Sequence, residues 1–316
     1  MNLIVFEDEG YKKLLPLVST RPVWELVSGA TTLLEKIKRE NPKADITFEC
    51  RDYLNCGKRS TVNGKRINGR QNVANLWDLI RNLKTDLEED LKYLGTGIKG
   101  KAHKSVVFYN KKNILVEKGA EIDANCVLDA RQGPIYIGAG TIVHPGTLLR
   151  GPISVGKNCR IAGEIVSSIF MDHVNKGHYG FIGHSYICSW VNLGAGTTNS
   201  NLKNNYSSVK VMVNGQPLDT GETFVGCFIG DHAKTAIGSL IYTGCVIGVA
   251  ANLFGQPYYK KFIPSFSWGE KGEAKIEEVI AIARAAMKRR NVELKPADIA
   301  ILKKVFDLTK SERNLL

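Results

Sequence analysis

The chain has 316 residues, of which 43% are hydrophobic and 23% are charged, and its formal net charge is +12. This composition is close to that of ordinary soluble domains, and the length is enough for one large domain or two moderate ones. No apolar run approaches the roughly 20 residues that a membrane helix needs, so we expect no membrane span. The basic excess is concentrated in residues 51–112, with 14 Lys/Arg against 6 Asp/Glu, and it favours anionic ligands.

Cysteine usage and the first residues bear on the cellular compartment. Seven cysteines are scattered along the chain, and none is part of a Cys-x-x-Cys pair. This pattern excludes a disulfide scaffold and a zinc ribbon, and we expect reduced, mostly buried thiols in a cytoplasmic protein. The apolar run Leu3–Phe6 is followed at once by Glu7, Asp8 and Glu9, which predicts a first strand and not a signal peptide.

The first 95 residues have mixed α/β character. Short strands are expected at residues 3–6 and 46–48, and apolar residues at helical spacing predict helices across residues 26–38 and 75–94. We interpret residues 1–95 as a small α/β domain. The Gly- and Lys-rich stretch that follows is interpreted as a linker, residues 96–113.

From about residue 114 the apolar residues recur every six positions, which is the strongest pattern in the sequence. Small residues often follow the apolar one, as in Ile137-Gly138 and Val155-Gly156. A period of six fits neither a simple sheet nor a helix, but it fits a parallel β-helix whose apolar residues point inward. Stacked coils of this kind share one continuous core. The hexads are Val116, Ile122, Leu128; Ile137, Val143, Leu149; Val155, Ile161; Phe181, Ile187, Leu193; and Ile229, Thr235, Ile241, Ile247, Leu253. We therefore assign residues 114–268 to a parallel β-helix.

Two stretches break this rhythm, and the last residues depart from it. Residues 199–223 are polar and rich in Asn, Ser and Gly, which predicts a loop extruded from the coils, and a smaller interruption covers residues 171–177. Residues 269–316 return to helical spacing, with Pro296 opening the second of two helices. We expect these helices to cap the open end of the solenoid.

Several motifs resemble those of a known family. The stretches are His178-Tyr179-Gly180-Phe181-Ile182-Gly183, Val191-Asn192-Leu193-Gly194-Ala195-Gly196-Thr197 and Asn192–Tyr206, with Leu15-Pro16-Leu17 and Thr20-Arg21-Pro22 near the start. They are similar to the hexapeptide-repeat acetyltransferase half of the bifunctional GlmU enzymes, and more closely to a GlmU-like group of sugar nucleotidyltransferases. The resemblance implies that the β-helix is left-handed, with about 18 residues per coil, and that three copies form a homotrimer with acyl sites between them.

The same resemblance implies roles for particular residues. His178 matches the general base that deprotonates the substrate amine, although a lone histidine is more often structural. Asn192 and Asn201 match amides that contact the sugar, and asparagine also forms ladders on β-helix corners. Gly194, Ala195 and Gly196 match the residues lining the acetyl-CoA channel, although the fold itself requires small corner residues.

Arg150 and Lys176 are candidate contacts to a substrate phosphate, as guanidinium and ammonium groups bind phosphate oxygens. Surface cations of this kind are more often simply solvated. Three positions depart from the acetyltransferase pattern: Phe181 replaces a tyrosine, Val166 a lysine and Leu202 a tyrosine. These changes remove polar contacts expected for glucosamine 1-phosphate.

The N-terminal domain is the weaker match. Arg21 could bind a nucleotide phosphate, and Glu25 or Asp8 could hold a metal, but the Gly-rich phosphate loop of complete nucleotidyltransferases is missing and 95 residues are too few for their domain. We prefer a structural role for the acidic residues and leave the identity of any metal open. The basic stretch Lys58-Arg59 to Arg70 lacks interleaved aromatics, so we interpret it as a solvated face and not a nucleic-acid site.

Three functions remain open from the sequence. The first is an acetyl-CoA-dependent acyltransferase acting on a sugar phosphate or nucleotide sugar, with no membrane partner. The second is a sugar-1-phosphate nucleotidyltransferase, which alone would require Mg²⁺. The third is a non-catalytic β-helix protein that binds a sugar nucleotide.

Overall fold

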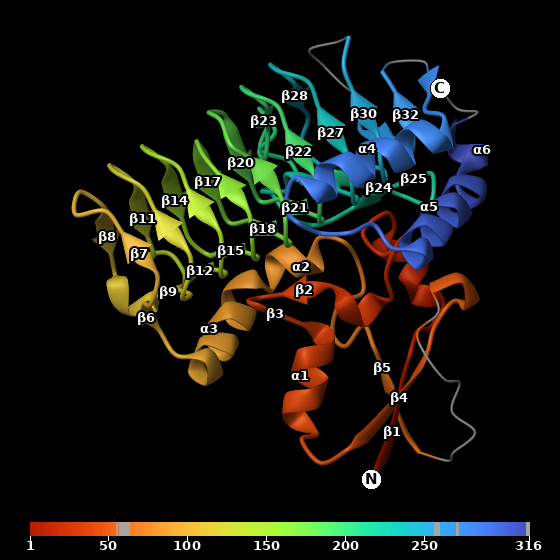
Figure 1. Cartoon of the computed structure of the whole chain (residues 1–316), viewed down its shortest axis with the longest axis horizontal. Coiled ribbons are helices and arrows are strands. Elements are labelled where there is room, and N and C mark those ends of the chain that lie inside the picture. The colour runs from red at the N-terminus through yellow and green to blue at the C-terminus, as the bar shows by residue number, and fades with distance from the viewer. Residues whose placement is uncertain (55, 57–63, 256–259, 270–271, 314–316) are drawn as a thin grey trace.

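The computed structural model describes residues 1–54, 56, 64–255, 260–269 and 272–313 (Figure 1). Its largest part is a parallel β-solenoid of short strands, and a small α/β domain lies against one side of it. Helices follow the last coil. The expected class, mainly β with a small N-terminal α/β domain and C-terminal helices, is confirmed.

The N-terminal residues form a three-stranded parallel sheet in the order β4–β1–β5. The strands are β1 (Asn2–Phe6), β4 (Asp45–Glu49) and β5 (Lys65–Asn68). The first expected helix begins later than the apolar spacing indicates, at α1 (Leu33–Glu40), because Thr32 forms a capping box with Glu35. The residues before it form the hairpin β2 (Val27–Ser28) and β3 (Thr31–Thr32). The second expected helix is split at Asn82 into α2 (Asp78–Arg81) and α3 (Leu83–Leu94).

Three parallel faces make up the solenoid, and we name each by its number of strands. The nine-strand face contains β6 (Gly97–Ile98), β9 (Ile114–Val116), β12 (Ile135–Ile137), β15 (Ile153–Val155), β18 (Ile169–Phe170), β21 (Tyr186–Ile187), β26 (Cys227–Ile229), β29 (Cys245–Ile247) and β31 (Phe262–Ile263). The ten-strand face contains β7 (Lys101–Ala102), β10 (Glu121–Ile122), β13 (Ile142–Val143), β16 (Arg160–Ile161), β19 (Asn175–Lys176), β22 (Asn192–Leu193), β27 (Lys234–Thr235), β30 (Asn252–Leu253), β32 (Ser267–Trp268) and β33 (Gly272–Glu273). The five-strand face contains β8 (Val107–Tyr109), β11 (Val127–Asp129), β14 (Leu148–Arg150), β17 (Glu164–Val166) and β20 (Phe181–Gly183). Figure 1 shows the pair β23 (Thr198–Asn199) and β28 (Leu240–Ile241) following β20 along the solenoid.

The apolar hexads form the core of the solenoid, as the sequence predicts, with one exception: Phe181 points outward, and its neighbour Ile182 takes the inward position. Residues such as Val143, Ile161 and Leu193 are fully buried in one continuous hydrophobic cluster. Parallel register stacks them, because Val143 pairs with Ile161 and Ile161 pairs with Lys176. An inward position is thus occupied by a lysine, and this explains why the apolar rhythm fails near residue 176.

Two boundaries differ from the expectation. Residues 96–113 are not a linker, because β6, β7 and β8 pair with the next coil and form the first turn of the solenoid. Two of these strands have only two residues and are rich in Gly and Lys, so they leave no hydrophobic signal. Residues 171–177 are not a loop either, since β19 within them pairs with both neighbouring strands of the ten-strand face.

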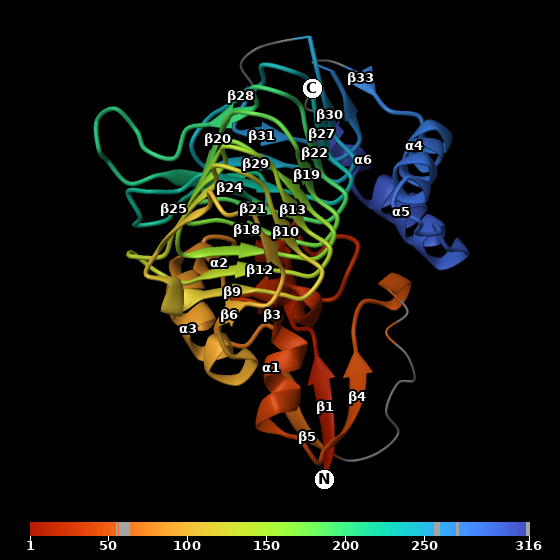
Figure 2. The same cartoon turned by 60° about the vertical axis from the view of Figure 1, so that its left-hand side comes forward.

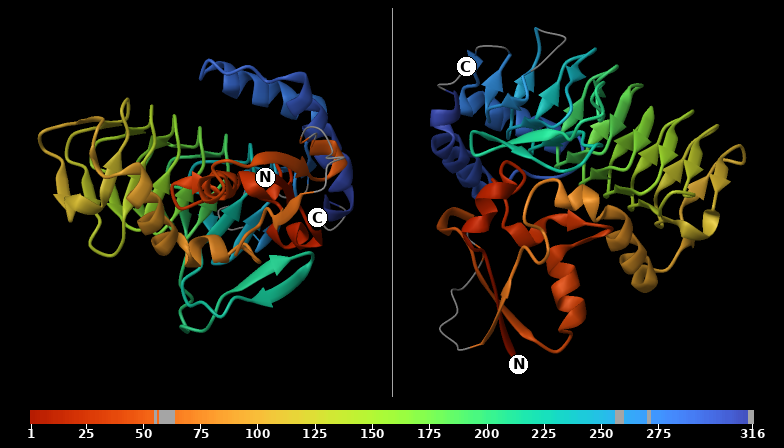
Figure 3. Two further views of the ribbon diagram at one scale, coloured as in Figure 1. Left: turned by 90° about the horizontal axis from the view of Figure 1, so that it is seen from below. Right: turned by 180° about the vertical axis from the view of Figure 1, so that it is seen from behind.

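The large interruption is confirmed. The chain leaves the solenoid after β23 and returns at β26, and between them it forms the antiparallel hairpin β24 (Lys210–Val213) and β25 (Gln216–Asp219). Figure 3 shows this hairpin beside the N-terminal domain. Arg81 of α2 holds the excursion in place, with its Nε 2.6 Å from Glu222 Oε1 and its Nη2 donating to the Thr220 carbonyl.

The N-terminal domain covers the nine-strand face (Figure 2). The outward side chains of this face are mostly large and apolar, and they join the core of the N-terminal domain in one cluster. They include Leu115, Tyr136, Ile169, Tyr186, Phe228 and Val246. The Tyr186 hydroxyl accepts a hydrogen bond from the Val27 N–H at 3.0 Å and lies 3.1 Å from its carbonyl oxygen. This face is therefore an internal interface.

The C-terminal segment is helical, as expected, in α4 (Ile276–Lys288), α5 (Pro296–Leu308) and α6 (Lys310–Arg313). The helices do not simply plug the open end. They pack on outward residues of the last coils, among them Ala250 and Phe266, and on Tyr53 of the N-terminal domain. The antiparallel strand β33 ends the ten-strand face instead.

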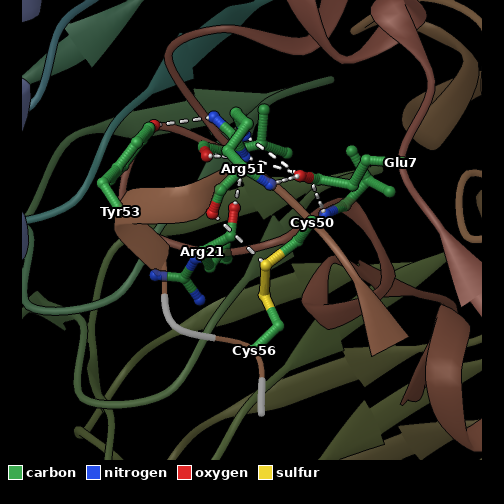
Figure 4. Close-up of a disulfide and its surroundings, with 8 residues drawn as sticks. Glu7, Arg21, Cys50, Arg51, Tyr53 and Cys56 are labelled. Atoms are coloured by element: carbon green, nitrogen blue, oxygen red, sulfur yellow. Dashed lines mark hydrogen bonds and ion pairs between the residues drawn. A yellow bond between two sulfur atoms is a disulfide. The ribbon is translucent and has the colours of Figure 1, made fainter. Parts of the chain in front are cut away.

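The expectation that all the cysteines are reduced is wrong for two of them. Cys50 and Cys56 form a disulfide, with their Cα atoms 6.2 Å apart, while the other five are buried thiols (Figure 4). The bond closes a loop around Arg51, whose guanidinium binds Glu7 and the carbonyls of Val18 and Arg21. These contacts hold Arg51, next to Cys50, against residues that are distant in the sequence. No cysteine-spacing motif predicts them. No helix in the described ranges is long and apolar enough to cross a membrane.

Candidate functional site

One edge of the solenoid brings several of the expected site residues together. We call it the histidine edge: the corners between the ten-strand and five-strand faces formed by residues 177–180, 194–197 and 236–238. The Gly196 N–H donates to the Tyr179 carbonyl at 3.0 Å, and the Gly238 N–H donates to the Ala195 carbonyl at 2.7 Å. His178 and Ala195 therefore occupy adjacent corners of consecutive coils.

The glycines of this edge are required by the close stacking of the coils. Gly180 has φ +124°, and a Cβ on it would lie 2.2 Å from the Thr197 carbonyl oxygen. Gly196 has φ +75°, and a Cβ there would meet the Tyr179 hydroxyl at 3.1 Å and its ring at 3.3 Å. The small residues here are therefore required by the fold itself, whatever their role in binding. Residues 194–196 are half-buried.

His178 is exposed at this edge, and a buried lysine fixes its backbone. The side chain of Lys176 is fully buried, and its Nζ donates to the carbonyls of His178, Tyr179 and Ala162. Burial lowers the pKa of Lys176 to about 8. The expectation that Lys176 contacts substrate phosphate is therefore corrected: its ammonium group faces the coil interior and holds the corner that carries His178.

The two expected sugar-binding asparagines lie apart. Asn192 stands on the ten-strand face, where its Oδ1 accepts a hydrogen bond from Asn175 Nδ2 at 2.7 Å, which is the ladder arrangement. Asn201 lies beyond β23, and its Nδ2 is 2.8 Å from His184 Nδ1. Because His184 follows β20 and His178 precedes it, the structure places Asn201 and His178 at opposite ends of this strand.

His184 is a residue that the sequence analysis did not single out. It stacks on Phe224 with a centroid distance of 5.2 Å, and burial lowers its pKa to about 4. Together with Trp77 and Arg81 it lines a cavity of about 410 Å³ between the solenoid, α2 and the chain excursion. The repeated spacing of six residues from His178 is the one sequence signal that could have indicated it.

The two candidate phosphate-binding arginines both have carboxylate partners. Arg150 is half-exposed and forms an ion pair with Glu164 on the adjacent strand. Arg21 is largely buried between the N-terminal domain and the solenoid, where its Nη2 binds Asp231 and its Nη1 lies 3.5 Å from Met171 Sδ. Thr20 also donates to Asp231. The motif near the start of the chain thus joins the two parts of the molecule.

Of the two acidic candidates in the N-terminal domain, Asp8 is the one paired with an arginine. Asp8 binds Arg70 and Asn68, and the hydrogen bond from Arg70 lowers its pKa to about 2, while burial raises the pKa of Glu25. Among the described residues, no group of three His, Cys, Asp or Glu is placed to hold a metal ion. The carboxylate of Asp8 is thus already neutralised by an arginine and does not fit a Mg²⁺ ligand in this arrangement.

The basic stretch is only partly described. Lys58 and Arg59 lie outside the described residues. At its other end Arg66 pairs with Glu49 and Arg70 pairs with Asp8, so these two arginines are engaged within the domain. Arg66 is half-exposed, as expected for a solvated face, whereas Arg70 is mostly buried and has a structural role.

Comparisons with known proteins confirm the resemblance drawn from the motifs. Residues 3–72 match the family model described as sugar nucleotidyl transferase. A bifunctional sugar-1-phosphate nucleotidylyltransferase/acetyltransferase of Sulfurisphaera tokodaii is 36% identical over 147 residues, which cover 46% of this chain and 36% of that protein. The bifunctional protein GlmU of Methanococcus aeolicus is 32% identical over 221 residues, covering 68% of this chain and 50% of that protein. The chain therefore spans at most about half the length of these curated relatives.

Solved structures were compared as well. The N-acyltransferase AntD from Bacillus cereus, solved with dTDP and 3-hydroxybutyryl-CoA, aligns over 65% of this chain and 96% of its own, with 16% identity and a TM-score of 0.28. The fold assignment follows from the strand register of the chain itself.

Proposed function

We propose that the protein transfers an acyl group from acetyl-CoA to an amino or hydroxyl group of a sugar phosphate or nucleotide sugar. The similarity to relatives named as sugar-1-phosphate nucleotidylyltransferase/acetyltransferase supports the class of reaction. The observation that carries the proposal is the histidine edge, where an exposed imidazole stands one coil away from the Gly194–Gly196 corner.

In this proposal His178 is the general base. A neutral imidazole accepts the proton that the attacking amine or hydroxyl group loses, and a positioned base of this kind accelerates a reaction about 100- to 10,000-fold. Lys176 is a positioning residue, because its ammonium group binds the carbonyls on both sides of this turn. Acetyl-CoA supplies the acyl group, and we expect it to lie along the half-buried corner of residues 194–196.

The proposal includes a homotrimer. The described helices and the N-terminal domain do not cover the five-strand face, and it carries half-exposed apolar side chains such as Val127, Leu148 and Phe181. Packing this face against a second copy would bring the histidine edge of one copy toward the Asn201 side of another. A substrate pocket would then form between copies, as the separation of His178 from Asn201 requires.

The test is the variant His178→Ala. Acetyl transfer to amino-sugar phosphates and to nucleotide-linked amino sugars should fall about 100-fold or more, while CoA binding and the melting temperature stay unchanged. His144→Ala is the matched control, because His144 lies on the same edge two coils earlier, and it should keep wild-type turnover. Undiminished transfer by His178→Ala would reject the base assignment.

Nucleotidyl transfer is a second candidate, favoured by the family model that matches residues 3–72. Release of pyrophosphate from a nucleoside triphosphate and a sugar 1-phosphate, with Mg²⁺ present, would support it. Two ion pairs argue against it, because Arg21 is already paired with Asp231 and Asp8 is already paired with Arg70. If neither activity is found and a sugar nucleotide still binds tightly, the third function, a non-catalytic binding protein, is favoured.

A further inference from the structure

A separate cavity of about 450 Å³ lies between the N-terminal domain and the nine-strand face. Its volume falls within the range of small-molecule sites. It arises at one step of the outward column of that face. The column contains Tyr136, Ser154, Ile169 and Tyr186, so a small serine stands where its neighbours are large.

Two buried polar groups in this cavity lack partners. Ser154 is 1% exposed, and its Oγ makes no hydrogen bond with any described residue. The Nε of Arg21 is likewise buried and unpartnered, although its two terminal nitrogens are engaged. Both residues line the cavity. Buried polar groups are rarely left unsatisfied, so these two point to a polar ligand.

The charge of the lining selects among polar ligands. Four carboxylates line the cavity, those of Glu25, Glu35, Glu117 and Asp172, against the two cations of Arg21 and Lys157. The charge of Arg21 is already matched by Asp231, so the cavity is acidic. An acidic lining attracts an amine and repels a phosphate.

The carboxylates also keep capacity to accept hydrogen bonds. Glu117 Oε2 accepts from the Ala139 N–H at 2.9 Å, and Asp172 Oδ1 accepts from the Lys157 N–H at 2.7 Å. Each ionised carboxylate has about four lone-pair positions, so most of them stay available for ligand hydroxyl and ammonium groups. The phenol of Tyr136 is already hydrogen-bonded to Glu117, and the hydroxyls of Ser154 and Ser189 are further polar groups of the lining.

We propose that this cavity binds a polyhydroxylated amine, of which an amino sugar without a phosphate group is the simplest example. The hydroxyls would pair with Ser154 and the carboxylates, and the ammonium group would face Glu117 and Asp172. The site is distinct from the histidine edge and does not depend on acyl transfer. It would make the junction of the two domains responsive to a free amino sugar.

Isothermal titration calorimetry on the full chain tests the proposal, with glucosamine, glucose and glucosamine 6-phosphate as probes. Glucosamine should bind at least about tenfold more tightly than either of the others, because glucose lacks the ammonium group and the phosphate is repelled. The absence of glucosamine binding, or tighter binding of the phosphorylated form, would overturn the proposal.

Two variants locate the site. Ser154→Leu fills the cavity with a side chain that suits its apolar neighbours in the column, and it should abolish glucosamine binding. Ser311→Leu, on exposed α6, is the matched control and should bind as the wild type does. Glu117→Gln should weaken glucosamine about tenfold and leave glucose unchanged, which decides the matter if Ser154→Leu does not fold.

The result is separable from the proposed acyl transfer. His178→Ala should bind glucosamine with wild-type affinity at this cavity, whatever its effect on turnover. Unchanged glucosamine affinity in both Ser154→Leu and Glu117→Gln would show that the amine binds elsewhere and would reject this site.

Discussion

Lys176 shows how one residue links the interior of a coil to its functional edge. It occupies an inward position between Ile161 and Leu193, which are both apolar and fully buried. Its ammonium group is satisfied by three backbone carbonyls at the corner that carries His178. A buried charge is tolerated when hydrogen bonds compensate for the lost hydration.

The pKa of this lysine leads to a prediction about stability at alkaline pH. Its ordinary value is 10.5, and burial lowers it to about 8 in the folded protein. Between these values the unfolded chain binds the proton and the folded chain does not, so the free energy of unfolding should rise with pH from about 8 to 10.5. The full contribution is about 3 kcal/mol.

Urea denaturation across this pH range measures the effect. Lys176→Met should flatten the rise relative to the wild type, since methionine fills the inward position without titrating. Lys234, whose pKa burial also lowers to about 8, is present in both proteins, so the difference between the two curves isolates Lys176. Parallel curves for variant and wild type would contradict the assigned pKa.

At the scale of single residues, the sequence predicts the place of a side chain only where a motif defines it. His178 and the Gly194–Gly196 corner lie side by side, as the motif indicates. Parallel register stacks residues that are one coil apart in the sequence, so the sequence spacing predicts their contact. Lys176 was misassigned because sequence spacing does not tell an inward from an outward side chain when the inward residue is polar. His184 was missed because its burial depends on Phe224, which comes from a chain excursion.

At the scale of elements, the sequence indicates that the nine-strand face is covered, but not by which segment. Strands such as Ile135–Ile137, Cys227–Ile229 and Cys245–Ile247 are buried throughout, which is the pattern of a sheet covered on both faces. The ten-strand face instead alternates half-buried and buried residues. What the sequence did not show is which segment provides the cover, because that contact joins residues more than 100 positions apart.

The Arg21–Asp231 ion pair fixes this docking, and its removal should be costly. Its side chains are 14% and 3% exposed, so Asp231→Ala would leave an arginine charge buried without a counter-ion. We expect a loss of about 3 to 5 kcal/mol in the free energy of unfolding. The double variant Arg21→Met with Asp231→Leu should recover most of this loss, because it removes both charges and keeps the volume.

A double-mutant cycle by chemical denaturation checks the prediction. The coupling free energy should account for most of the effect of Asp231→Ala. Arg150→Met with Glu164→Leu is the contrasting pair, since its exposed ion pair should couple by no more than about 1 kcal/mol. If the two cycles gave equal coupling energies, the buried pair would not be the anchor of the domain.

The whole molecule has its three long sides in different environments. The N-terminal domain covers the nine-strand face, and α4 and α5 pack on outward residues of the last coils. The five-strand face keeps half-exposed apolar residues along its length, from Val107 to Phe181. Between them lies the half-exposed ion pair of Arg150 and Glu164, and such a mixture of apolar and charged side chains is typical of a protein interface.

The trimer is therefore the prediction that concerns the whole molecule. Light scattering should give three times the chain mass of 34.8 kDa. Leu148→Asp, in the middle of the open face, should shift the mass toward one chain, because it buries a charge in the contact. It should also reduce acyl transfer, since the proposed pocket lies between copies. Leu308→Asp, on a 55% exposed position of α5, is the control and should leave the mass and the turnover unchanged. A wild-type mass of 34.8 kDa with full acyl transfer would refute both the trimer and the pocket between copies.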